Sequence, residues 1–490
     1  MRWWTLAGAV ALWGVAVRFV VARSDSVPAF YYPDSWNYVV PNAENFRPHS
    51  FHGPMLYWLW DLLLPVTPTE DRVVLLQQVL GVAAVVLITL TLRRVVDDVI
   101  ALAAGLVLGI QPLTMFFERS IMTEAVSVFL VALVVFCLGE LLVFREAQAR
   151  RSVVLYAGLA GALGLAAGAL IALRPSSRWA AFVLVASALV PVLRGRTVAG
   201  ASRRLRGGIA GLLLVSAGLL PMILMVENSR HYGTASLTPA SGTALLSEYG
   251  HLVPCAGQPG DTARARAAIG QVCDRERPDR QPMWVIDSPL FQTFFSGEDF
   301  AATQDQMWGR ARSAVVRSPF TVAGRALAVS ATHVANPELQ LRLYDNGVRW
   351  FEDDAFEIFD SHAVWFDGET DRTLADETPV FRVVRQTHRL PGIAFVVIAA
   401  VTILAIVRSG RRVWSARRRR QALGAELQAF ERPLVHLIGA AVAAVAANEL
   451  IVAVGGIAIV RYWVPMLPLL VVAGAGMLEL FRERRRSGAR

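Results

Sequence analysis

The chain has 490 residues, of which 54% are hydrophobic and 18% are charged. Soluble globular proteins contain about 45–50% apolar and about 25% charged residues, so this composition argues against a water-soluble protein. All 48 lysine-plus-arginine positions hold arginine. The lack of lysine excludes enzymes that form a Schiff base on a lysine side chain. It also excludes a Walker A loop, whose Gly-Lys step binds nucleotide phosphates.

Apolar stretches recur along the chain, and each is long enough to cross a bilayer core of about 30 Å as a helix. The sequence therefore predicts an α-helical polytopic membrane protein with about ten transmembrane helices. The first stretch is too long and too rich in tryptophan for a cleaved signal peptide, so we expect a retained anchor. The expected spans are residues 3–22, 73–92, 99–117, 121–144, 153–173, 179–193, 207–226, 390–407, 433–454 and 462–481.

Charge differs between the loops on the two sides of these spans. With a cytoplasmic N-terminus, the inner loops and the C-terminal tail carry 23 arginines and only six acidic residues. Because basic loops remain in the cytoplasm, we expect a multi-pass plasma-membrane protein with both termini cytoplasmic. The net charge of +9 is then explained by topology and contact with anionic lipids, and it does not indicate nucleic-acid binding.

Two segments are expected outside the membrane. Residues 23–72 form the first outer loop, and residues 227–389 hold 22 acidic residues and 16 arginines. The length, prolines and tryptophans of the second segment predict an extracytoplasmic α or α+β domain inserted before the last three spans. The chain is thus divided into a transmembrane region (1–226), the extracytoplasmic domain (227–389), and the C-terminal transmembrane helices with a basic tail (390–490).

The outer domain contains two features with open interpretations. Cys255 and Cys273 are disulfide candidates because an oxidising compartment favours the bond; the alternative is two free thiols. Residues 301–334 are predicted to be helical, with a break at Ser318-Pro319. Such helices can lie along the membrane surface or pack within the outer domain, and the sequence favours neither. Elsewhere, the Gly164 and Gly168 pair is typical of close helix packing.

The first outer loop places an acid among aromatic residues. Asp34 follows Tyr31, Tyr32 and Pro33, and Tyr38 lies four residues beyond it. Partial desolvation raises the proton affinity of a carboxylate, which suits general-base catalysis, and aromatic faces can stack on a sugar ring. The alternative is an aspartate that only caps the turn after Pro33.

A second candidate lies between the third and fourth expected spans. Glu124 is placed about one turn into a hydrophobic helix, where an ionisable group costs about 2–3 kcal/mol and usually faces a cavity or a partner. Glu118 and Arg119 precede it. These two can simply pair with each other at the surface, and without further information that interpretation is preferred.

The third candidate opens the last span. Arg461 precedes Tyr462 and Trp463 at the expected outer interface, where a guanidinium can hold a phosphate through two hydrogen bonds. The alternative is an interfacial anchor. Arg174 ends the fifth span on the same side, with the same two interpretations. In the predicted topology Asp34, Glu124, Arg174 and Arg461 all reach the outer surface, which indicates one interfacial cleft.

These motifs, in this order, resemble those of the GT-C glycosyltransferases. Relatives are the protein O-mannosyltransferases, the aminoarabinose transferases of lipid A and the arabinofuranosyltransferases of actinobacterial cell walls. The resemblance covers the spans and the first loop but not residues 227–389. Many relatives have a second acid beside the first-loop aspartate, where this chain has Ser35, and several have an aspartate at position 124. The motifs are YPDSWNY (32–38), HSFHGPMLY (49–57), ERSIMTE (118–124), LRP (173–175) and RYWVPMLP (461–468).

The resemblance implies an inverting hexosyl- or pentosyltransferase that moves a sugar from a polyprenyl-phosphate donor to a hydroxyl acceptor on the outer face. The acceptor would be a cell-wall glycan, a glycolipid or a protein. Asp34 would be the base, Glu124 would orient the acceptor or the sugar, and Arg461 would hold the donor phosphate, whose charge develops on leaving. Arg47 and His52 are reserve candidates for that phosphate.

No cofactor is required by this reading, although a divalent cation (Mg²⁺ or Mn²⁺) remains open. The acidic residues 352, 353, 354 and 357 could bind it, or they could form a solvated face. Asn448 and Glu449 would bridge helices or line the donor groove. Two other functions compete with the enzyme: a transporter or flippase of lipid-linked sugars, which needs charges along a path through the bilayer, and a non-catalytic cell-envelope assembly protein.

Overall fold

The computed structural model describes residues 2–24, 70–120, 122–143, 149–194, 202–252, 259–273, 289–293, 299–335, 379–418, 433–454 and 460–488. Within these ranges the regular secondary structure is helical and no β-strand occurs. Eight helices there are long and apolar enough to cross a membrane. The prediction of an α-helical polytopic membrane protein is therefore confirmed. These helices are α1 (Trp3–Ser24), α4 (Glu70–Arg93), α7 (Glu124–Val143), α8 (Ala149–Leu173), α9 (Arg178–Arg194), α10 (Arg203–Tyr232), α21 (Pro433–Val454) and α22 (Leu467–Gly488).

The third expected span, over residues 99–117, is not one straight helix. It consists of α5 (Asp98–Gly109) and α6 (Pro112–Arg119), which are bent by 45° relative to each other. Pro112 cannot donate a backbone hydrogen bond, and it forces the preceding Gln111 into an extended conformation. The Gln111 side chain then accepts from the Leu113 backbone N–H at 3.2 Å and caps α6.

The eighth expected span lies in α19 (Leu390–Arg418), whose apolar part, Leu390–Leu404, is shorter than the others. Its first turn packs tightly against the C-terminal end of α15 (Pro319–Ala335). A Cβ added at Gly392 would collide with the carbonyl oxygen of Val334. This glycine therefore permits the start of α19 to touch the end of α15.

Helices α8 and α10 pack at short range through the glycine pair that the sequence singled out. A Cβ at Gly168 would lie 2.6 Å from the carbonyl oxygen of Ala217, and one at Gly164 would collide with that of Leu213. Only glycine allows this approach of two helix backbones. The expected role of the pair in helix packing is confirmed.

Beyond α10 the chain forms a group of short helices with a small apolar core of its own. They are α11 (Ser241–Tyr249), η2 (Gly250–Leu252), α12 (Ala263–Cys273), α13 (Pro289–Gln292), α14 (Phe300–Arg317) and α15 (Pro319–Ala335). The core includes Leu246, Ile269, Phe300 and Met307. The break between α14 and α15 falls at Ser318-Pro319, as the sequence predicted.

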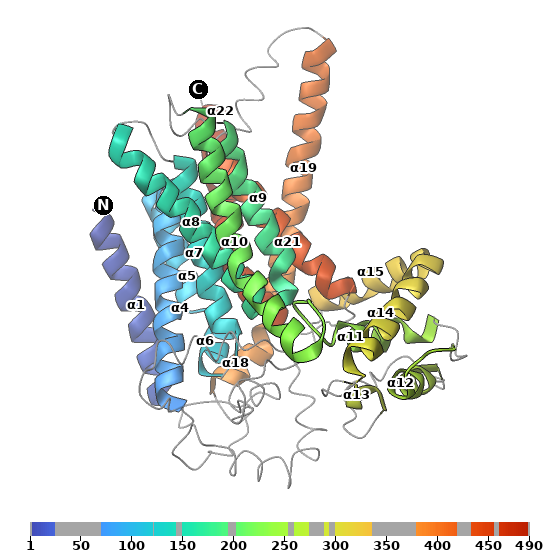
Figure 1. Cartoon of the computed structure of the whole chain (residues 1–490). Helices are drawn as coiled ribbons and strands as arrows, with labels where there is room; N and C mark the ends of the chain where they lie inside the picture. Colours follow the sequence, from blue (N-terminus) through green and yellow to red (C-terminus); the bar gives the residue numbers. More distant parts are fainter. Residues whose placement is uncertain are drawn as a thin grey trace.

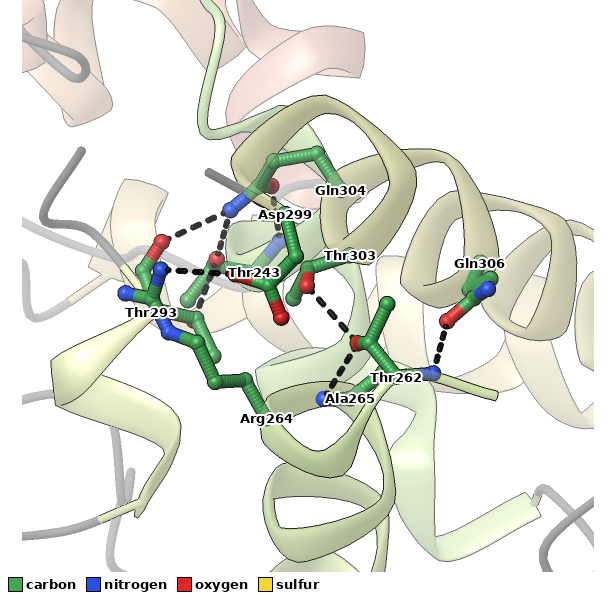
Figure 2. A network of polar contacts seen from close by, with 9 residues as sticks. All are labelled: Thr243, Thr262, Arg264, Ala265, Thr293, Asp299, Thr303, Gln304 and Gln306. Atoms are coloured by element: carbon green, nitrogen blue, oxygen red, sulfur yellow. Dashed lines mark hydrogen bonds and ion pairs between the residues drawn. The ribbon is translucent and has the colours of Figure 1, made fainter. Parts of the chain in front are cut away.

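A polar network ties these helices together (Figure 2). The Gln304 amide on α14 donates to the Thr243 hydroxyl at 2.8 Å and to the Thr293 carbonyl at 2.9 Å. The hydroxyls of Thr243 and Thr293 are 2.7 Å apart, and those of Thr262 and Thr303 are 2.8 Å apart. Because buried polar groups are costly unless they are bonded, this satisfied network fixes α11, α13 and α14 relative to one another.

Both chain termini lie at one end of the bundle, and α11–α15 lie at the other (Figure 1). At the end with the termini, Arg482 of α22 pairs with Asp97, which precedes α5, at 2.9 Å. The hydrogen bond from Arg482 is the main reason why the pKa of the Asp97 carboxyl is held below its usual value. We call the end that carries α11–α15 the domain end. Helix α18 (Pro379–Thr387) also lies there, beside α6 (Figure 1).

Candidate functional site

Glu124 and Arg174 form a buried ion pair at the domain end of the bundle. Glu124 is the first residue of α7, and Arg174 follows the last residue of α8, just before η1 (Pro175–Ser177). Arg174 Nη1 donates to Glu124 Oε1 at 2.5 Å, and the two side chains are 8% and 1% exposed. The Thr123 hydroxyl lies 3.4 Å from both groups. The partner that a carboxylate at position 124 requires is therefore Arg174.

The ring of Tyr462 lies beneath this arginine. The guanidinium carbon of Arg174 is 5.0 Å from the ring centroid of Tyr462, within the range of a cation–π interaction. Tyr462 belongs to η5 (Val460–Met466), which immediately precedes α22. Its carbonyl accepts from the Asn448 amide of α21 at 3.4 Å. Three motifs far apart in the sequence thus meet at one place.

A second polar cluster adjoins the first. It is built on Glu449, which follows Asn448 on α21, and on Trp463, which follows Tyr462 in η5. The Glu449 carboxylate binds His333 Nδ1 at 2.7 Å and the Ser330 hydroxyl at 2.9 Å. The His333 imidazole stacks on the Trp463 indole, with 4.8 Å between ring centroids. His333 and Ser330 belong to α15, so this cluster joins the helices of the outer segment to the membrane bundle.

Glu118 lies in another buried pair. Its Oε2 accepts from Arg18 Nε at 2.7 Å, and its Oε1 accepts from Arg18 Nη2. The two side chains are 1% and 5% exposed. The preferred interpretation of Glu118 and Arg119 as a surface pair was therefore wrong. Glu118 instead joins α6 to α1 through its ion pair with Arg18. Arg119 is also buried, with 2% of its surface exposed.

Gln77 of α4 completes the attachment of α6. Its amide nitrogen donates to the carbonyls of Glu118 and Ser120 at 3.0 and 2.9 Å. Gly81, one turn further along α4, faces the Glu118 carboxylate so closely that a Cβ there would collide with it. The end of the broken span is thus held from two sides, by α1 and by α4.

Several predicted site residues lie outside the described residues. They include Asp34, Tyr38, Arg47 and His52 of the first loop, Cys255 of the disulfide candidate, and the acidic run at 352–357. Cys273 is the last residue of α12, and Arg461 is placed in η5 by its backbone, directly before Tyr462. In the part of the chain that the structure describes, no group of three or more His, Cys, Asp or Glu residues could hold a metal ion. The roles given to all these residues stay predictions.

The helix ends that flank the first loop lie at the domain end of the bundle (Figure 1). The loop joins the last residue of α1, Ser24, to the first residue of α4, Glu70. Asp34 follows Ser24 by ten residues. The helix ends that flank residues 25–69 are therefore at the end of the bundle that holds Glu124, Arg174 and Tyr462.

Sequence reasoning missed two members of these clusters. Arg18 lies within the first apolar span, and a charge in such a position signals a partner; that signal was available. His333 gave no comparable signal, because its partner Glu449 is 116 residues away in sequence.

The sequence matches no protein-family model and no curated protein. Among solved structures, the chain is similar to the oligosaccharyltransferase of Archaeoglobus fulgidus in its apo form. The similarity covers 99% of this chain and 52% of that chain, with a TM-score of 0.41 and 13% sequence identity. This chain therefore spans about half the length of that protein. A similarity at this level carries no argument about function, so the proposal below rests on the residues of this chain.

Proposed function

We propose that this chain is a GT-C-type glycosyltransferase that moves a sugar from a polyprenyl-phosphate donor to a hydroxyl acceptor at the outer surface of the membrane. The observation that carries the proposal is the meeting of Glu124, Arg174 and Tyr462 at the end of the bundle where α1 ends and α4 begins. These residues belong to the motifs on which the resemblance to GT-C enzymes rests. Their proximity is what a shared site requires.

In the proposed reaction the acceptor hydroxyl oxygen attacks the anomeric carbon, and the bond between that carbon and the phosphate oxygen breaks. The electron pair leaves with the polyprenyl phosphate, and Asp34 takes the proton from the hydroxyl. Direct in-line attack inverts the anomeric configuration. Negative charge grows on the departing phosphate, and an arginine placed at that oxygen stabilises it.

Arg461 is the proposed phosphate ligand, because its backbone lies in η5 directly before Tyr462. Besides the expected orientation of acceptor or sugar, we propose a second role for Glu124. Its Oε1 accepts the hydrogen bond from Arg174, so we assign it to holding the guanidinium above the Tyr462 ring. Arg174 would then contribute a fixed positive group beside Arg461. An arginine held in place loses less entropy on binding a phosphate than a mobile one.

The arrangement of buried charges favours an enzyme over a flippase. A transporter places charged groups along a path through the bilayer. Among the described residues, the ion pairs in which both side chains are less than 10% exposed all belong to elements that reach the domain end: Glu124–Arg174, Glu118–Arg18, Glu449–His333 and Asp261–Arg310. The buried Glu479 at the other end pairs with the partly exposed Arg482. This one-sided distribution fits a reaction at the interface.

The test is a transfer assay with defined donors. Proteoliposomes containing the purified chain are supplied with polyprenyl-phosphate mannose, arabinofuranose or glucose and with a hydroxyl acceptor. Divalent cations are first chelated and then restored as Mg²⁺ or Mn²⁺, which decides the question of metal dependence. The proposal expects one donor to yield a glycoside of inverted configuration and free polyprenyl phosphate. Donor that crosses the bilayer with its sugar–phosphate bond intact would show a flippase instead.

The sidedness of the site has a separate test. Single cysteines at Arg417 and Asp261 are probed in intact cells with a membrane-impermeant maleimide. The proposed topology expects labelling at position 261 and protection at position 417. The reverse pattern would place the site in the cytoplasm and rule out this donor chemistry.

A further inference from the structure

Helix α15 presents an apolar face that no described part of the chain covers. Phe320 is 91% exposed and Leu327 is 72% exposed. Between and beyond them on the helix, Ala323, Gly324, Ala328 and Ala331 are exposed as well. Spacings of three, four and seven residues place these side chains on one side of a helix. The exposed stripe therefore runs along most of α15.

The opposite side of α15 is attached to the membrane bundle. Ser330 and His333 bind Glu449 of α21, and the Val334 carbonyl lies against Gly392 at the start of α19. Figure 1 shows that α15 crosses the direction of α19, whereas the membrane helices of the bundle run roughly parallel to α19. In the same view α15 is on the bundle side of the outer helices, and α12 and α13 are farther from the spans (Figure 1).

A second exposed apolar surface lies on α19. The first turns of α19 expose Leu390 and Ile393 by 55% and 52%, and Val397 by 57%. These residues begin the apolar part of α19, Leu390–Leu404, which coincides with the eighth span expected from the sequence. Gly392 touches Val334 near the end of α15, so the two exposed apolar surfaces belong to helices that are in contact.

Charge at the start of α15 suits a phospholipid surface. Arg312 and Arg317 of α14 are both exposed, and Arg317 lies three residues before Phe320. An amphipathic helix at an interface combines an apolar face in the acyl-chain boundary with basic groups near lipid phosphates. An apolar face without nearby basic residues would fit a protein partner equally well.

We propose that α15 lies in the plane of the membrane at the domain end, with Phe320 and Leu327 inserted at the boundary between headgroups and acyl chains. The lipid surface thus covers the exposed apolar face of α15. The helix then fixes the height of the outer helices above the bilayer, and it holds His333 against Glu449 at that level. This inference does not depend on the proposed glycosyl transfer.

The test measures contact between α15 and lipid directly. An environment-sensitive fluorophore is attached to Phe320→Cys or Leu327→Cys in a background of Cys137→Ala, Cys255→Ala and Cys273→Ala. The protein is placed in nanodiscs that contain phosphatidylglycerol with a nitroxide near the top of the acyl chain. Two matched controls carry the label at Val397→Cys, in a span, and at Ala267→Cys, an exposed position on α12.

We expect the nitroxide lipid to quench the labels at 320 and 327 at least half as strongly as the label at 397, and to leave the label at 267 unchanged. Labels at 320 and 327 that behave like the one at 267 would overturn the proposal. Loss of quenching at 397 would also overturn it, since α19 would then not lie in lipid.

A second measurement avoids the cysteine replacements. A photoreactive benzoylphenylalanine is introduced at Phe320 in the otherwise native chain, and the irradiated protein is examined by mass spectrometry. Adducts with phospholipid support the in-plane helix. Cross-links to a second copy of the chain or to another protein would show that a protein covers the face, and they would contradict it.

Discussion

The imidazole of His333 and the indole of Trp463 are nearly parallel, with 7° between their planes, and the indole N–H donates to the His333 carbonyl at 3.2 Å. His333 belongs to α15, outside the bundle, and Trp463 follows Tyr462 in η5. The contact therefore connects the outer helices to the element that supports Arg174. One peptide unit separates Trp463, which His333 contacts, from Tyr462.

Replacement of His333 tests this connection. The change His333→Leu removes the donor to the buried Glu449 carboxylate, and we expect a loss of stability of at least about 1–3 kcal/mol. His333→Gln keeps an N–H donor and should lose less. Thermal unfolding of the purified protein in detergent measures both. The control is His231→Leu, at a partly exposed position; equal losses at 231 and 333 would show that the buried contact has no special role.

The ion pair between Glu124 and Arg174 predicts strong coupling in a double-mutant cycle. Either single change, Glu124→Gln or Arg174→Gln, leaves one buried charge without its partner, which costs about 3–5 kcal/mol. The double change removes both charges, so it should cost clearly less than the sum. The exposed pair Glu227–Arg230 is the matched cycle, for which about 0–1 kcal/mol is expected. A coupling energy no larger than in this control would contradict the buried pair.

The packing of α8 on α10 predicts different effects of the same substitution at two glycines. Gly168→Ala places a Cβ 2.6 Å from the Ala217 carbonyl oxygen, whereas Gly158 has no atom within 4 Å of its added Cβ. Overpacking costs about 1–3 kcal/mol, but alanine in an open helix position gains up to about 1 kcal/mol over glycine. Unfolding measurements should show a loss at 168 and none at 158. Similar behaviour at the two positions would refute the close helix contact.

The membrane helices could be predicted from the sequence because each span carries its own signal in a continuous apolar run. The bend at Pro112 was missed because the apolar run shows no sign of it. Apolarity continues through residues 99–117 with little interruption, and the break depends on one proline and the cap from Gln111. Hydropathy over a whole span does not detect such a local backbone effect.

The partners of the buried charges were the hardest part to predict. Glu124, Arg174 and Tyr462 were singled out because each stood at the outer end of a span, and the structure brings them together. Arg18 and Glu118 are 100 residues apart, and the adjacent Arg119 offered a simpler partner. Proximity in the sequence favours pairing of Glu118 with Arg119. A side chain buried at a helix end instead pairs with a charged residue of the helix that packs against it. His333 was missed in the same way.

Replacement of Asp34 tests the central claim most directly. Transfer from a polyprenyl-phosphate donor is measured in proteoliposomes for Asp34→Asn and for the adjacent Ser35→Ala, after both variants are shown to be folded by unfolding curves that match the unchanged protein. A general base contributes about 10²–10⁴-fold to the rate. The account predicts that Asp34→Asn loses at least about 100-fold in transfer rate while Ser35→Ala stays active. Full transfer activity of a folded Asp34→Asn protein would contradict it.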